Sequence, residues 1–552
     1  MNISAIRAPR TAATLIVVRD AASLGVEVLL LRRAQGDDYF SGAWVFPGGR
    51  VDVGDRQSQR FCVNLDDATA SFRLGLPHHG LDYYVAAIRE CFEEAGLLFA
   101  TTDSGEAPDF QDEGGTRVAD WRTQLQRNER DWNSLCEDAG LCLSVDQLVY
   151  FSHWITPIGM AKRFDTRFFL AKAPAGQIAV HDGTEMVEQL WITPADALAQ
   201  SATLRFVDAT RHTLATLVDF DSVASLLAWA REPREIRAIT PRIAMGRAGR
   251  QSVLPHEWAW AEIGKLDSQG QGTASCELLP GVAVRLSERV IRVMANNGSL
   301  MTGPGTNSYL VGGGESNEWA VIDPGPLDTL HVEALLAAAP GKIRWILATH
   351  THKDHSPAVA LLKSRTGASV YGRVADFPVR QDATFLPDRI LYGGECVALP
   401  GPSTLRAIHT PGHASNHICY LLEEEKLLFT GDQVMQASTV VIDPPDGDMA
   451  AYLVSLQALL SEDLAWLAPG HGFLMTDTHQ AITHIIQHRH KREAKVRAVL
   501  RAHGPASEAL LLAEVYDDVP QILHGAAKRS LLAHLIKLKN EGAAEEYKGM
   551  WR

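Results

Sequence analysis

The stretch from Trp345 to His355 reads WILATHTHKDH, an apolar run that passes directly into a cluster of histidines with an aspartate. The apolar part is typical of a buried strand, so the polar part is predicted to form a turn at its carboxyl end. A lone core histidine commonly fills a polar niche, but such a dense cluster favours a metal site. The four candidate ligands are His350, His352, Asp354 and His355.

Three later segments repeat this arrangement, because His413, Asp432 and His471 each follow a strand-like run and a turn containing glycine. Neutral imidazoles and carboxylates suit borderline divalent cations such as zinc, although iron and manganese accept them too. Two such ions can share one water and lower its pKa toward neutrality. We therefore expect a metal-bound hydroxide to attack the substrate, so that no serine or cysteine nucleophile is needed.

In their order and spacing these residues resemble the H-x-H-x-D-H motif and the later His, Asp and His of the metallo-β-lactamase superfamily. The resemblance implies an αββα sandwich that binds two zinc ions, with Asp354 also acting in catalysis and Asp323 as a supporting residue. The implied ligands are His350, His352 and His413 for the first ion, Asp354, His355 and His471 for the second, and Asp432 as a bridge.

The segments 302–311, 407–415 and 528–542 resemble β-lactamase-like proteins with a small winged-helix extension, a branch that includes an endoribonuclease. Residues 433–470 are too few for the large inserted domain of other RNA-processing relatives. Basic residues close together in the tail leave RNA open as a partner, against the alternative of a solvated basic face. They are Arg489, Lys491, Arg492, Lys495, Arg497 and Arg501.

In the N-terminal half, Glu90, Glu93 and Glu94 stand at helical spacings that place three carboxylates on one face, and Gly96 lies near the expected helix end. Carboxylates so placed repel one another, which favours a hard cation such as magnesium between them. The alternative is an acidic face exposed to solvent.

Gly48-Gly49, together with Arg89-Glu90 and the later glutamates, resembles the two halves of the Nudix box. Residues 56–88 separate the halves, and Asp55 stands where the box has glutamate, as in the subfamily that contains peroxisomal coenzyme A diphosphatases. The resemblance implies a Nudix α/β/α sandwich with Mg²⁺ or Mn²⁺ on Glu90, Glu93 and Glu94, the last two being catalytic. The alternative that this domain binds a nucleotide-like ligand without cleaving it is also compatible with the sequence.

The chain of 552 residues is too long for one hydrophobic core, and its composition is that of a globular protein with a net charge of -14. It contains no apolar run long enough to span a bilayer and no secretory signal in Met1–Arg10, so we expect a cytoplasmic protein that does not associate with membranes. The expected fold class is α/β and α+β multidomain. The expected divisions are a Nudix-like domain at 1–235, a linker at 236–282, a metallo-β-lactamase domain at 283–485 and a winged-helix-like domain at 486–552.

These observations predict a metal-dependent hydrolase acting on a small-molecule ester or thioester, or on a phosphodiester. The Nudix domain is expected to hydrolyse a nucleoside-diphosphate-linked substrate such as a coenzyme A derivative. One alternative is an endoribonuclease in which the Nudix-like and winged-helix domains bind RNA or nucleotides. A non-catalytic metal protein is a further alternative, and the pattern assigns no oligomeric state.

Overall fold

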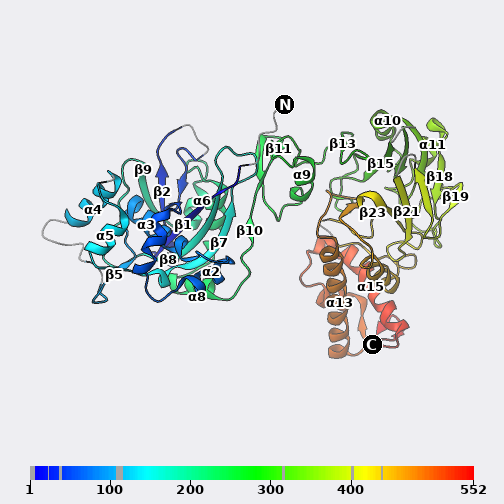
Figure 1. Cartoon of the computed structure of the whole chain (residues 1–552). Helices are drawn as coiled ribbons and strands as arrows, with labels where there is room; N and C mark the ends of the chain where they lie inside the picture. Colours follow the sequence, from blue (N-terminus) through cyan, green and yellow to red (C-terminus); the bar gives the residue numbers. More distant parts are fainter. Residues whose placement is uncertain are drawn as a thin grey trace. The chain divides into compact units, whose positions relative to one another are not determined.

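The computed structural model describes residues 7–22, 24–36, 40–106, 108, 116–127, 129–313, 317–399, 403–436 and 439–552. The chain divides into two compact units (Figure 1). Unit 1 comprises Met1–Ile243 and Gln269–Gln271, and unit 2 comprises Ala244–Ser268 and Gly272–Arg552.

A mixed sheet forms the centre of unit 1, with strand order β10-β7-β8-β1-β2-β3 and with β4 and β9 attached to β1 and β2. β1 and β8 run parallel, and β1 pairs antiparallel with β2. The strands are β1 (Arg10–Asp20), β2 (Val26–Arg33), β3 (Trp44–Val45), β4 (Gly48–Arg50), β7 (Val149–Ile155), β8 (Phe164–Lys172), β9 (Met186–Ile192) and β10 (Ala238–Ile239).

Helices cover both faces of this sheet, so the predicted α/β/α sandwich is confirmed. α3 contacts β1 and β8, whereas α8 contacts β7, β1 and β8. The helices are α1 (Val53–Gln57), α2 (Asp67–Leu74), α3 (Leu81–Ala95), α4 (Thr116–Gln126), α5 (Trp132–Asp138), α6 (Pro194–Ala199), α7 (Asp208–Leu217) and α8 (Val223–Arg231). A separate pair of strands, β5 (Ala100–Thr102) and β6 (Leu141–Leu143), lies beyond α3 in the chain.

The stretch 236–282, expected as a linker, contains regular elements. β11 (Arg242–Gly246) and β12 (Gly249–Val253) form a hairpin, and α9 (Trp260–Leu266) follows. Glu262 on α9 is buried and accepts two hydrogen bonds from the Arg292 guanidinium, at 2.6 and 2.8 Å. Frequent proline and glycine hid these short elements in the sequence pattern, because neither residue is favoured inside regular structure.

Two facing sheets build the main part of unit 2. The first has the order β13-β14-β15-β16-β17-β18-β19 and the second the order β20-β21-β22-β23-β24. The strands are β13 (Ala283–Arg285), β14 (Val290–Met294), β15 (Asn307–Gly313), β16 (Glu318–Ile322), β17 (Lys342–Leu347), β18 (Ser369–Gly372), β19 (Arg389–Ile390), β20 (Cys396–Leu399), β21 (Ser403–His409), β22 (Ile418–Leu422), β23 (Leu427–Gly431) and β24 (Trp466–Pro469).

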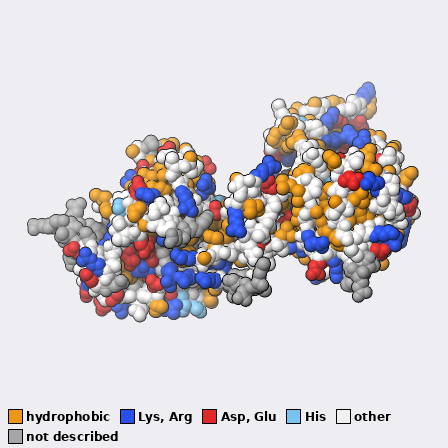
Figure 2. All heavy atoms as spheres, turned by 90° about the horizontal axis from the view of Figure 1, so that it is seen from above, with side chains coloured by type: hydrophobic (Ala, Val, Ile, Leu, Met, Phe, Trp, Pro, Cys, Tyr) orange, Lys and Arg blue, Asp and Glu red, His pale blue; other side chains and the backbone are white. Residues whose placement is uncertain are grey.

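Alternating side chains divide the core of unit 2 into layers. Tyr309 and Val311 on β15 face the second sheet, whereas Leu310 between them packs with α10 (Thr329–Ala338) and α11 (Val359–Thr366). On the second sheet, β22 and β23 pack outward against α12 (Met449–Leu459). The predicted αββα sandwich is therefore confirmed. On the surface of this unit, Figure 2 shows hydrophobic side chains on the face that it displays.

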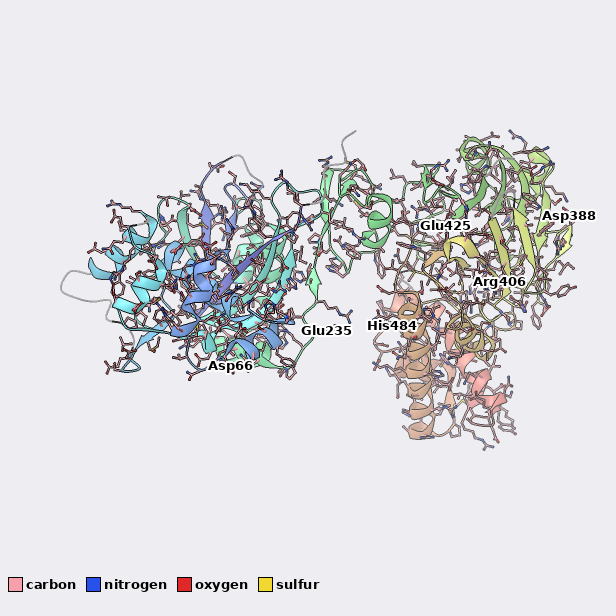
Figure 3. All side chains as sticks on the ribbon, viewed as in Figure 1. Asp66, Glu235, Asp388, Arg406, Glu425 and His484 are labelled. Atoms are coloured by element: carbon pink, nitrogen blue, oxygen red, sulfur yellow. The ribbon has the colours of Figure 1, made fainter. Side chains whose placement is uncertain are left out.

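The edge of the first sheet is held by Asp388, which is labelled in Figure 3. Its carboxylate accepts hydrogen bonds from the Val370 amide at 2.8 Å and from the Lys363 ammonium at 2.6 Å. This carboxylate closes the long connection that runs from β18 to β19.

The chain ends in a winged-helix fold with its own core. α13 (Thr478–His503), α14 (Glu508–Val515) and α15 (His524–Asn540) pack with a small sheet of β25 (Ala506–Ser507), β27 (Met550–Trp551) and β26 (Glu546–Tyr547). In the part of the chain that the structure describes, no helix combines the length and apolar character needed to cross a bilayer.

Three of the six lysine and arginine residues of α13 form ion pairs with acidic residues. Arg489 is buried and donates to the Val440 carbonyl. Half of the basic residues predicted from the sequence are thus neutralised by acidic residues of the same domain. The ion pairs join Arg492 to Asp518 at 2.7 Å, Lys495 to Asp517, and Arg497 to Glu541 at 3.1 Å.

Candidate functional site

Four turns of unit 2 carry the residues singled out as metal ligands, and each comes after the end of a strand. His350, His352, Asp354 and His355 follow β17, whereas His413, Asp432 and His471 follow β21, β23 and β24. β23 and β24 are parallel neighbours, so their carboxyl ends meet at one edge of the second sheet. The sandwich thereby brings residues more than a hundred positions apart to one place.

All seven side chains come together. Three groups of ligand atoms each lie within 4.8 Å of one another, namely His350 with His352 and His413, His350 with His355 and Asp432, and Asp354 with His355 and His471. The Asp432 carboxylate joins the groups, with one oxygen 3.6 Å from His413 Nε2 and the other 3.3 Å from His471 Nε2. Asp354 Oδ2 lies 3.4 Å from both His355 Nε2 and His471 Nε2.

Several of these atoms are buried and lack a protein partner. Within the described residues, His350 Nε2, His355 Nε2 and Asp432 Oδ1 have no hydrogen-bond partner and negligible solvent exposure. Buried polar atoms are normally paired, because the loss of hydration is otherwise uncompensated. Imidazole nitrogens and carboxylate oxygens converging in this way fit divalent cations.

The outward nitrogens of the histidines are held by other groups. His355 Nδ1 lies 2.9 Å from Asp323 Oδ2, His413 Nδ1 2.8 Å from the Val441 carbonyl, and His471 Nδ1 3.1 Å from the Gly305 carbonyl. Such contacts fix the tautomer and turn Nε2 toward the centre.

Asp323 supports the centre without lying among the converging ligand atoms. Its carboxylate also accepts hydrogen bonds from the Thr349 amide and hydroxyl, both at 2.7 Å. Its backbone has φ of 51°, a left-handed conformation that aspartate tolerates better than most residues. Asp323 therefore connects the end of β16 to the first ligand turn.

Burial and charge divide the histidines into two kinds. Burial lowers the pKa of His350 well below its usual value and that of His352 to about 3, so both are neutral imidazoles. Burial acts in the same direction on His355 and His471, but the neighbouring carboxylates outweigh it and raise both pKa values, that of His471 to about 9. The carboxylates beside His355 and His471 thus favour positive charge in that part of the centre.

His417 is a buried part of this site that the sequence interpretation missed. Its Nε2 accepts a hydrogen bond from the Asp432 amide at 3.2 Å, and its Nδ1 lies 2.9 Å from Thr410 Oγ1. Its ring stacks on that of His350, with centroids 5.1 Å apart. His417 follows His413 closely in the chain. The ligand motif does not include His417, because His417 contacts candidate ligands and is not itself one of the converging metal-binding groups.

Asp446 joins two of the ligand turns. Its carboxylate accepts hydrogen bonds from the Ser415 hydroxyl at 2.5 Å and from Gln381 Nε2 at 2.8 Å. Gln381 Oε1 in turn accepts from Thr351 Oγ1 at 2.7 Å. The turn carrying His352 and the turn carrying His413 are therefore tied through one carboxylate that no motif indicated.

Unit 1 contains a cavity of about 510 Å³ lined by Glu90, Glu93 and Glu94. All three lie on α3, and Glu94 Oε2 accepts a hydrogen bond from the Gly48 amide at 2.9 Å. Burial raises the pKa of Glu90 to about 7 and that of Glu94 well above its usual value. Oxygen donors of this kind suit magnesium or manganese, which would relieve their mutual repulsion.

Two of the three glutamates nevertheless lie beside an arginine. Arg89 Nη1 lies 2.9 Å from Glu90 Oε1 and 3.4 Å from Glu93 Oε2. Among the described residues, every group of three or more ligand atoms within 4.8 Å belongs to unit 2, so these carboxylates share a cavity without converging to the same degree.

Asp55 takes a supporting position beside the same arginine. It is 1% exposed, and its two oxygens accept hydrogen bonds from Arg89 Nε at 2.8 Å and Nη2 at 3.2 Å. It also accepts from the Asp52 amide at 2.7 Å at the start of α1. The shorter side chain that stands in place of glutamate therefore still pairs with Arg89.

Three parts of the chain match models of known families. Residues 68–205 match a model described as NUDT19 Nudix domain, and residues 301–471 one described as Metallo-beta-lactamase superfamily. Residues 508–551 match a model described as Beta-lactamase associated winged helix domain. The three matches succeed one another in the predicted order.

Curated relatives match a little under half of the chain. The chain is 30% identical over 267 residues to a protein of Caenorhabditis elegans named Beta-lactamase-like protein 2 homolog, a match covering 47% of this chain and 88% of that protein. It is 34% identical over 250 residues to an Aspergillus chevalieri protein named Atrochrysone carboxyl ACP thioesterase, covering 44% and 73%. Among solved structures, a NUDIX hydrolase from Alicyclobacillus acidocaldarius matches with a TM-score of 0.35 and 27% identity, covering 40% of this chain and 96% of that one.

Proposed function

The chain belongs to the metallo-β-lactamase superfamily, and we propose that its C-terminal unit hydrolyses a small-molecule ester or thioester at a centre that holds two zinc ions. The observation that carries this proposal is the convergence of seven histidine and aspartate side chains, several with buried and unpartnered atoms. A relative 34% identical to this chain is named as a thioesterase, which favours acyl substrates over phosphodiesters.

The zinc ions, when bound, supply a Lewis acid and an activated water. His350, His352 and His413 would hold one ion, Asp354, His355 and His471 would hold the other, and Asp432 would contribute its carboxylate where the two ligand groups meet. In the reaction, water adds to the acyl carbon, the bond to oxygen or sulfur breaks, and the alcohol or thiol leaves with a proton. Asp354, with its side chain 27% exposed, is the carboxylate placed to exchange that proton.

We propose a second hydrolytic centre in the Nudix domain, acting on a nucleoside-diphosphate-linked substrate such as a coenzyme A derivative. Glu90, Glu93 and Glu94 would hold Mg²⁺ or Mn²⁺, with Glu93 and Glu94 closest to the chemistry. Their shared cavity and the raised pKa values of these buried carboxylates support this assignment. The limits 1–235, 236–282, 283–485 and 486–552 remain proposals for the domain bounds.

The endoribonuclease alternative has less support. RNA binding needs exposed positive charge, yet Arg492, Lys495 and Arg497 on α13 pair with acidic residues of the same domain. The alternative predicts RNA cleavage by the zinc-loaded chain, which a direct assay can measure.

The test compares three probes on the zinc-loaded full chain: p-nitrophenyl acetate, S-acetyl-N-acetylcysteamine and a single-stranded RNA oligonucleotide. We expect ester or thioester hydrolysis that Asp354→Asn lowers by at least about 100-fold, because a ligand carboxylate is lost. Glu94→Gln, in the other unit, is the control and should retain the full rate. RNA cleavage that depends on Asp354, with both acyl probes intact, would refute the esterase proposal and favour the nuclease.

A further inference from the structure

The connection from β18 to β19 exposes large apolar side chains, and it adjoins the turns that carry His352 and His413. Val374 is 52% exposed, Phe377 43% and Val379 62%, all within a few residues. We call these three side chains the apolar lip. Single exposed apolar residues are ordinary, but a group of them beside a reactive centre marks a binding surface.

Hydrogen bonds hold the lip segment against the ligand turns. The Arg373 carbonyl accepts from Asn416 Nδ2 at 2.8 Å, and the Asp376 amide donates to Ser415 Oγ at 2.8 Å. Asn416 and Ser415 belong to the turn that carries His413. The start and the middle of the segment are therefore attached to one ligand turn.

The far end of the segment is attached to the other ligand turn. Gln381 forms an isolated β-bridge with His352, and the Asp382 amide donates to the Thr351 carbonyl at 2.7 Å. Arg380 near this end of the segment pairs with Asp443 at 2.6 Å. The backbone of the lip is thus fixed by the same residues that position His352 and His413.

From this arrangement we infer that the apolar lip binds the acyl chain of the substrate, so that the enzyme prefers esters or thioesters of medium or long acyl groups. This inference rests on the proposed esterase function and names its substrate class. An acyl chain is the occupant that the position favours, because the carbonyl carbon must reach the metal centre while the rest of the acyl group extends over the adjoining segment. Water leaves the lip when the chain covers it, which stabilises the complex.

The first experiment compares p-nitrophenyl acetate with p-nitrophenyl octanoate on the zinc-loaded full chain. The wild type should show a higher kcat/KM for octanoate. The double substitution Phe377→Ser and Val379→Ser should lower kcat/KM for octanoate by about 10-fold, because apolar contacts with the chain are lost. The rate on acetate should stay within about twofold, as for an ordinary surface substitution.

Val454→Ser is the matched control, because Val454 is 70% exposed on α12 and lies outside the lip. It should leave both rates unchanged. An equal loss on acetate and octanoate in the lip variant would show that the segment only supports the ligand turns, and would overturn the inference. Unchanged rates on both esters in the lip variant would overturn it too.

A binding measurement separates this inference from the proposed function. Isothermal titration calorimetry with sodium octanoate reports occupancy of the lip without turnover, and the lip variant should bind about 10-fold more weakly than the wild type. Octanoate binding that depends on the lip, in a chain that cleaves no ester, would refute the esterase function. The inference that the lip binds an acyl chain would still hold. Ester cleavage with neither chain-length preference nor octanoate binding would support the esterase function and refute the inference about the lip.

Discussion

Asp323 lies outside the candidate metal centre but contacts one of its candidate ligands, His355. Its carboxylate accepts from both groups of Thr349 while facing His355 Nδ1. An amide in its place would present one donor group and keep only one acceptor oxygen. The ring of His355 would then lose the partner that holds Nε2 toward the centre.

We therefore predict that Asp323→Asn weakens zinc binding and lowers kcat by about 10- to 100-fold, the usual effect of losing such a supporting carboxylate. Competition with a chromophoric chelator measures the affinity. Asp328→Asn is the control, because Asp328 only caps α10 through the Leu330 amide. Equal zinc affinity in the two variants would contradict the role assigned to Asp323.

A second residue-scale prediction concerns Gly49 in unit 1. A Cβ built there would lie 2.4 Å from the Glu90 carboxylate, so Gly49→Ala must displace that side chain. We expect about a 10-fold or greater loss in the cleavage of coenzyme A to two phosphomonoesters, because misplaced catalytic groups are costly. Mass spectrometry of the products measures it.

Gly54→Ala is the matched control for this change, since the nearest atom to its added Cβ, Asn133 Nδ2, is 3.6 Å away. It should keep the coenzyme A activity. Full activity in Gly49→Ala would argue that Glu90 takes no part in the Nudix chemistry.

At the scale of elements, the residues at the ends of strands were the easiest to predict from the sequence. The seven candidate ligand side chains each come after an apolar run, and the structure brings all of them together. His417 and Asp446 were not found, because they act through hydrogen bonds to other segments and leave no periodic signal. The hairpin β11–β12 and α9 cannot be predicted for another reason, since short elements between prolines and glycines contain too few residues to show a periodic pattern.

The buried pair of Glu262 and Arg292 makes α9 part of unit 2. Each side chain is 3% exposed or less, and Glu262 also accepts from the Leu474 amide at 2.9 Å. Removing one partner leaves the other charge buried without compensation. We expect Glu262→Leu to lower the free energy of unfolding of unit 2 by about 3–5 kcal/mol.

Urea denaturation of the full chain measures this loss. The control is Glu318→Leu, which removes the partner of Arg344. Because the Arg344 side chain is 48% exposed, this change should lower the free energy of unfolding by less than about 1 kcal/mol. The double variant Glu262→Leu and Arg292→Met should recover stability, because no buried charge remains. Similar losses for Glu262→Leu and Glu318→Leu would mean that the buried pair contributes no more than an exposed one.

At the scale of the whole molecule, each unit has its own candidate metal site, and the two sites are built from different kinds of side chain. Imidazoles dominate the centre in unit 2, whereas the candidate metal ligands of the cavity in unit 1 are carboxylates. A ligand stabilises the folded state that binds it, by an amount set by its concentration relative to its Kd. Zinc should therefore act on one unit rather than on the chain as a whole.

We predict that zinc at about 100 times its Kd stabilises unit 2 by about 2.7 kcal/mol and raises the Tm of its transition by about 5 °C. Differential scanning calorimetry of the metal-stripped chain, with and without zinc, measures the shift. The transition of unit 2 is recognised because Glu262→Leu lowers it. Asp432→Ala should abolish the zinc shift, since this carboxylate joins the ligand groups, whereas Glu94→Gln should retain it. A shift that survives Asp432→Ala, or that falls on the other transition, would place the zinc site elsewhere.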